Sequence, residues 1–161
     1  VDKMPPVYGF MGVRGGEIQL NALETRVVNE VMSWTQDLYS FQTEEIVQGL
    51  SYPFHLEGRY LNDLNELSPL LRQWFVVNQL PNFRDNPWPI KEVSLVSAPG
   101  WADNPFDTSD AETIAQLGLG DTDFVVAVDF QNPEDPFDIV LETFYVRLVG
   151  SRPTIAGISH E

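Results

Sequence analysis

The chain has 161 residues, of which 43% are hydrophobic and 12% aromatic, so it can form one domain with a core and is not a disordered chain. Its 24 acidic residues against 9 lysines and arginines give a net charge of −15, which disfavours binding to nucleic acid or to an anionic membrane surface. It contains no cysteine, which excludes disulfides, zinc–thiolate sites and thiol nucleophiles.

Residues 1–20 predict an extended N-terminal arm. Two consecutive prolines, Pro5 and Pro6, block a helix, and several glycines interrupt any long strand. The arm is rich in apolar side chains, which need a covering surface on their own domain or on a neighbouring subunit. We therefore expect Tyr8, Phe10 and Met11 to contribute to an interface.

The first main helix is predicted over residues 21–39. Asn21 and Glu24 have the three-residue spacing of a capping box, in which each side chain bonds the backbone of the other residue. Apolar residues then recur at helical spacing as far as Leu38. A short second helix is expected from Thr43 to Gly49.

The second main helix is predicted over residues 66–80, with Ser68 as its cap and Pro69 at its first position. Residues 51–61 before it are typical of a strand, and Pro53 favours an edge position. After it, the pattern predicts a strand at residues 90–96. A long loop and a short helix closed by Gly118 and Gly120 are expected next.

Two long strands with apolar alternation form the clearest signal, at residues 123–130 and 137–150. Six residues join them into a C-terminal hairpin, and Glu142 interrupts the apolar face of the second strand. The predicted fold class is α+β, with two main helices packed on an antiparallel sheet of about four strands. The predicted organisation is an arm at 1–20, one domain at 21–150 and a polar C-terminal tail at 151–161.

The tripeptide Pro-Phe-Asp occurs twice in acidic surroundings, within 103–107 and within 134–138. Proline with aspartate or asparagine is typical of turns, so we interpret both as turns, the second at the tip of the hairpin. Neither stretch has the ligand spacing or the central glycine of an EF-hand calcium loop. We therefore assign no metal site.

No catalytic or cofactor motif is found, and we expect no cofactor and no enzyme activity. Of the two histidines, His55 could pair with Glu57 on the same strand face. No serine lies in a G-x-S-x-G turn, and the glycines near residue 120 follow a helix and lack the lysine of a phosphate loop. A pocket at His55 in a small ligand-binding or enzymatic domain stays an alternative.

The charge is unevenly distributed, because residues 92–146 contain 12 acids and no lysine or arginine. Such a surface is either a solvated acidic face or a contact for a basic partner. Two tryptophans in proline-rich loops are further candidates for interface anchors. Besides the residues of the arm, the predicted interface residues are Trp88, Trp101, Phe106, Asp107, Glu134 and Asp135.

The function favoured by these features is a non-enzymatic assembly subunit, such as a neck or tail protein of a tailed phage, forming a homo-oligomer or ring with protein partners. This suggestion compares the chain with the general character of such subunits, and no sequence motif supports it. The alternative is an acidic inhibitor or immunity-type protein, a nucleic-acid mimic whose residues 92–146 bind a basic partner. No signal peptide and no membrane span are visible, which favours a virion or the cytoplasm.

Overall fold

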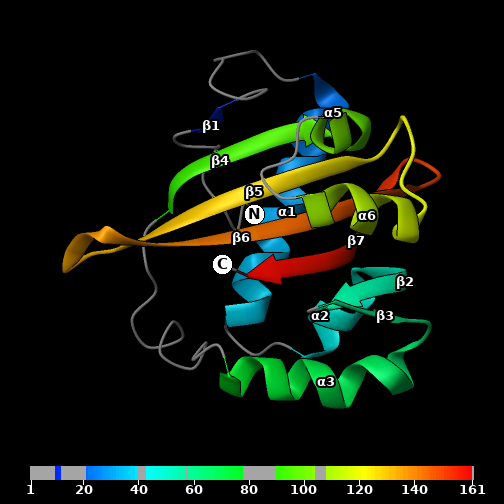
Figure 1. Ribbon diagram of the computed structural model, residues 1–161, viewed down its shortest axis with the longest axis horizontal. Coiled ribbons are helices and arrows are strands. Elements are labelled where there is room, and N and C mark those ends of the chain that lie inside the picture. The colour runs from blue at the N-terminus through cyan, green and yellow to red at the C-terminus, as the bar shows by residue number, and fades with distance from the viewer. Residues whose placement is uncertain are drawn as a thin grey trace.

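The computed structural model describes residues 10–11, 21–39, 43–56, 58–77, 90–103 and 108–160 (Figure 1). The helices in these ranges are α1 (Ala22–Tyr39), α2 (Thr43–Gln48), α3 (Leu64–Val77), α5 (Ala98–Asp103) and α6 (Thr108–Leu117). The strands are β1 (Phe10–Met11), β2 (Leu50–Leu56), β3 (Arg59–Leu61), β4 (Ile90–Ser97), β5 (Phe124–Asn132), β6 (Asp135–Val149) and β7 (Arg152–His160).

The strands form one mixed sheet in the order β1-β4-β5-β6-β7-β2-β3. The pairs β1–β4 and β2–β7 are parallel, and the other neighbouring pairs are antiparallel. The predicted α+β class is confirmed. The predicted sheet of about four antiparallel strands is wrong, because the sheet is mixed and has seven strands, six of them three residues or longer.

Strand β7 explains most of this difference. The sequence pattern predicts a polar tail at residues 151–161, but β7 lies inside the sheet between β6 and β2. Ile155, Ala156 and Ile158 are all fully buried. A strand that is covered on both faces does not alternate apolar with polar residues. It therefore lacks the pattern by which strands are recognised in a sequence.

Helices cover both faces of the sheet. The larger apolar cluster joins α1, α2 and α3 to one face and includes Phe144 and Val146 of β6. The smaller cluster joins α5 and α6 to the other face and includes Tyr145. Figure 1 shows α6 and α1 on opposite sides of the central strands. Successive residues of β6 therefore point into two different cores.

The N-terminus of α1 has the predicted capping box. The backbone N–H of Asn21 donates to Oε1 of Glu24 at 3.0 Å, and the N–H of Glu24 donates to Oδ1 of Asn21 at 2.8 Å. These two bonds satisfy donors that have no partner inside the helix.

The start of α3 differs from the prediction, because Asp63 and not Ser68 caps it. Oδ1 of Asp63 accepts the N–H of Glu66 at 2.9 Å, and Oε1 of Glu66 accepts the N–H of Asn62 at 2.7 Å. These two bonds cap the helix in a way similar to a capping box and start it about one turn earlier, so that Pro69 lies inside the helix.

Two other local predictions are corrected. Strand β2 is not at the edge of the sheet, since it lies between β7 and β3. Its register with β7 shifts between Leu50 and His55, so Pro53, which follows a cis peptide bond, lies in an irregular stretch where no ladder donor is needed. The segment 98–103, expected to be a loop, forms α5.

The hairpin of β5 and β6 is confirmed, with nine registered residue pairs that begin at Phe124–Val146 and end at Asn132–Asp135. The face predicted to be apolar packs into the larger cluster on both strands. None of the described helices is long and apolar enough to cross a membrane.

Arg147 ties three elements of the fold together. Its Nη1 donates to Oγ of Ser51 at 2.8 Å, and its Nη2 donates to the carbonyl oxygens of Pro53 at 3.1 Å and Leu117 at 2.7 Å. Burial lowers the pKa of Arg147, and the carboxylate of Asp123 opposes this shift. The guanidinium thus holds β6 to β2 and stabilises the carbonyl end of α6.

We expect Arg147→Met to lower the free energy of unfolding by about 2–3 kcal/mol, because it removes charged hydrogen bonds while the methionine keeps the apolar stem. Urea unfolding followed by circular dichroism measures the change. Arg72→Met on the exposed face of α3 is the matched control and should shift stability by less than about 0.5 kcal/mol. Equal losses in the two variants would contradict the assigned role of Arg147.

Candidate functional site

The connection between β5 and β6 is a turn held by its own side chains. Oδ1 of Asn132 accepts the N–H of Glu134 at 2.9 Å, and Oδ1 of Asp135 accepts the N–H of Phe137 at 3.0 Å. Nδ2 of Asn132 also donates to Oδ2 of Asp138 at 3.0 Å. The expected hairpin turn is present at residues 133–134, with short polar side chains bonding nearby backbone, and the second Pro-Phe-Asp tripeptide directly after it belongs to the start of β6.

The first residues of β6 after this turn are exposed, and Phe137 is the extreme case at 93% exposure. Ile139, two residues further along β6, is 38% exposed. The surrounding acids Glu134, Asp135 and Asp138 are exposed as well. Figure 1 shows that this end of the hairpin extends to the left beyond the other strands. We call residues 133–139 the hairpin tip.

The same stretch has an unpaired strand edge. Pairing of β6 with β7 ends at Glu142 and His160, whereas β6 begins seven residues earlier, at Asp135. On its other side β6 pairs with β5. Residues 136–138 are irregular, because they have no registered partner in β5 and the N–H of Phe137 bonds Asp135. Within the described residues no strand pairs with the second edge of 139–141, so this short stretch has backbone groups that point away from the sheet.

The predicted interface residues are divided between described and undescribed parts of the chain. Glu134 and Asp135 lie at the hairpin tip. Phe10 and Met11 form β1 at one edge of the sheet and Trp101 belongs to α5, with only their backbone positions described. The remaining candidates lie outside the described residues: Tyr8, Trp88, Phe106 and Asp107.

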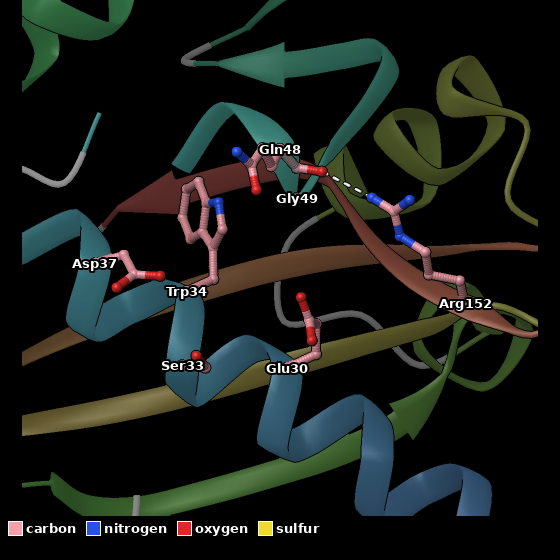
Figure 2. A pocket seen from close by; sticks show the side chains of 7 residues that line it. All are labelled: Glu30, Ser33, Trp34, Asp37, Gln48, Gly49 and Arg152. Atoms are coloured by element: carbon pink, nitrogen blue, oxygen red, sulfur yellow. Dashed lines mark hydrogen bonds between the residues drawn. The ribbon is translucent and has the colours of Figure 1, made fainter. Parts of the chain in front are cut away.

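A pocket of about 260 Å³ lies between α1, the end of α2 and the start of β7 (Figure 2). Its lining is mostly polar and includes two carboxylates, Glu30 and Asp37, and one guanidinium, Arg152. Nη2 of Arg152 donates to the carbonyl oxygen of Gln48 at 2.7 Å, which links β7 to α2 across the pocket. The complete lining is Glu30, Ser33, Trp34, Asp37, Gln48, Gly49 and Arg152.

His55 is buried beside aromatic rings and does not line this pocket. Its Nε2 accepts the backbone N–H of Gly58 at 3.1 Å, which supports the turn between β2 and β3. Its ring lies 5.3 Å from that of Tyr60 and 5.8 Å from that of Tyr145. Through these contacts His55 packs against the smaller apolar cluster. Its predicted partner Glu57 lies outside the described residues.

Glu142 is the charged residue that the sequence pattern showed only as an interruption. Its side chain is fully buried, and its strand position lies on the face of the larger apolar cluster, between Val140 and Phe144. In the strand register it lies opposite His160 of β7. In the described part of the chain, no group of three or more histidine or acidic residues could hold a metal ion.

No family model and no curated protein matches the chain. Among solved structures, it is similar to a crystal structure of a putative ketosteroid isomerase from Shewanella frigidimarina NCIMB 400, with a TM-score of 0.48 and 10% sequence identity. The similarity covers 87% of this chain and 98% of that chain. A similarity this distant carries no argument about activity or ligand.

Gly157 allows β7 to pack against His55 and Tyr145. A Cβ at this position would lie 2.8 Å from Cβ of His55 and 3.1 Å from its carbonyl oxygen, and 3.1 Å from the Tyr145 ring. We expect Gly157→Ala to lower the free energy of unfolding by about 1–3 kcal/mol, because backbone and ring cannot both move away. Thermal or urea unfolding measures the loss.

Gly120→Ala is the matched control for Gly157→Ala, since a Cβ at Gly120 meets no atom within 4 Å. Its stability should stay within about 0.5 kcal/mol of the parent protein. A Gly157→Ala variant as stable as Gly120→Ala would show that the contact between β2, β6 and β7 is looser than described.

Proposed function

We propose that this protein is a non-enzymatic domain that binds a basic partner protein through the hairpin tip. The observation that carries the proposal is Phe137, an aromatic side chain that is 93% exposed at the end of a projecting hairpin. Aromatic residues are among the commonest energetic anchors of interfaces, and burying one contributes more than most other contacts. A phenylalanine with this exposure in the free protein is available to such a partner.

The charge at the hairpin tip defines the kind of partner. Three exposed acids surround Phe137, and no lysine or arginine occurs between Lys91 and Arg147. A partner with basic residues around an apolar recess would match this pattern. Attraction of this kind speeds association and weakens as salt screens it.

The unpaired edge of β6 adds a backbone contact. An extended segment of the partner could pair with residues 139–141, where its main chain would bond the outward N–H and C=O groups. Its side chains would then lie beside Ile139 and close to the exposed Phe137. We therefore propose an extended, basic and partly apolar segment as the element that the hairpin binds.

One part of the alternative prediction is retained, namely a basic partner that binds within residues 92–146. The binding surface is now limited to the hairpin tip and the strand residues next to it. A virion component has no support from the comparisons. It stays a prediction that the protein forms a homo-oligomer or ring, and that it has no enzyme activity. Light scattering at low and high salt tests self-association, which the charge of −15 should oppose at low salt.

The test uses labelled twelve-residue peptides that alternate apolar with basic residues, and a second set in which acidic residues replace the basic ones. Fluorescence polarisation should show saturable binding of the basic set only, weakened by added salt. Phe137→Ala should reduce the affinity at least tenfold, because the anchor side chain is lost. The stability of this variant should be unchanged, since Phe137 is exposed.

Val149→Ala is the matched control, because Val149 is another exposed apolar residue of β6, at the opposite end of the strand. It should bind the basic peptides within about twofold of the parent protein. Equal binding of the acidic peptides, or equal losses in the two variants, would overturn the proposal.

A further inference from the structure

Separately from the hairpin, we propose that the pocket in Figure 2 binds a small organic cation through a primary ammonium group. The site lies at the other end of β6 from the hairpin tip, beside the start of β7. It depends on a different set of residues, so it can be tested independently of the proposed partner.

The volume of the pocket sets the size of the ligand. At about 260 Å³ it lies just below the range of roughly 300–1,000 Å³ that is typical of sites for drug-sized ligands. A short alkyl chain with one polar end fits such a space. A nucleotide or a large ring system does not.

The charges of the lining set the chemistry. Glu30 and Asp37 bring two carboxylates to the pocket, against one guanidinium from Arg152. Arg152 already donates through Nη2 to the Gln48 carbonyl, which directs part of its hydrogen-bonding capacity to the protein. The net charge of the chain adds a field that attracts cations and repels anions. An ammonium group is therefore favoured over a carboxylate or a phosphate.

The polar groups also match the donors of an ammonium, which has three N–H bonds and no acceptor. Figure 2 shows Glu30 and Asp37 on the same helix, with Ser33 between them and Gln48 across from them. The spacing of Glu30, Ser33 and Asp37 places all three on one face of α1. The Glu30 carboxylate, the Ser33 hydroxyl one turn further along α1 and the Gln48 amide oxygen are the candidate acceptors, and Asp37, about two turns from Glu30, adds negative charge.

The wall that presents these groups is held in place by Trp34. Its side chain is only 2% exposed, and its Nε1 donates to the carbonyl oxygen of Ile46 at 2.9 Å. Its ring also meets that of Phe144 edge to face at 5.9 Å. These contacts fix α1 against α2 and the sheet, so only the exposed side chains of Glu30 and Gln48 have to be ordered when the ligand binds.

The experiment is a titration of the isotope-labelled full chain with n-butylammonium, followed by amide chemical shifts, with 1-butanol and butyrate as the neutral and anionic analogues. Saturable shifts are expected at residues 30–37, 48–49 and 152 for n-butylammonium alone. Glu30→Gln should weaken this binding at least fivefold, because a charged hydrogen bond is lost. Phe137→Ala should leave it unchanged, which separates this site from the hairpin.

Glu112→Gln is the matched control, since it changes the net charge equally on the exposed face of α6. It should bind n-butylammonium as the parent protein does, and urea unfolding confirms that both variants are folded. If Glu30→Gln and Glu112→Gln weakened the binding of n-butylammonium equally, the amine would be attracted only by the overall negative charge of the chain, which would overturn the proposal. Equal binding of 1-butanol, or no saturation up to about 100 mM amine, would overturn it as well.

Discussion

The burial of β6 on both faces is the constraint on which the rest of the structure depends. Phe144, Tyr145 and Val146 are consecutive and all fully buried, so neighbouring side chains point into two separate cores. A strand in this position has no solvent-exposed face, and helices must cover both sides of the sheet. Arg147 follows directly and connects the same strand to β2 and α6. The rigid centre of β6 thereby positions both of its ends.

The two proposed sites follow from those ends. At its beginning, β6 extends past the last residue of β7 and presents Phe137 to solvent on a strand that is anchored in the core. After its end at Val149, a short turn leads to Arg152 beside α1 and α2. A partner segment and a small cation would therefore bind to one well-packed sheet at opposite ends. Both ligands are cationic, as expected for a chain this acidic.

The elements that could be predicted from the sequence are those with local signals. The capping box of Asn21 and Glu24 and the alternation in β5 and β6 depend on residues that are close in the chain. Strand β7 could not be found in this way, because burial on both faces removes its alternation. The exposure of Phe137 could not be predicted from the sequence either, because it depends on how far β6 extends past β7. The pocket combines side chains from three separate segments, and no local pattern connects Glu30 with Arg152.

The central claim, that the hairpin tip is the surface that meets a basic partner, can be tested most directly by mapping amide chemical shifts on the isotope-labelled protein. The titrant is a basic, partly apolar peptide at low and at physiological salt. We expect shifts that saturate at the non-proline residues of 133–141, weaken with salt and leave the amides of α3 unchanged. Shifts confined to the pocket around Glu30, or spread evenly over the acidic surface, would contradict it.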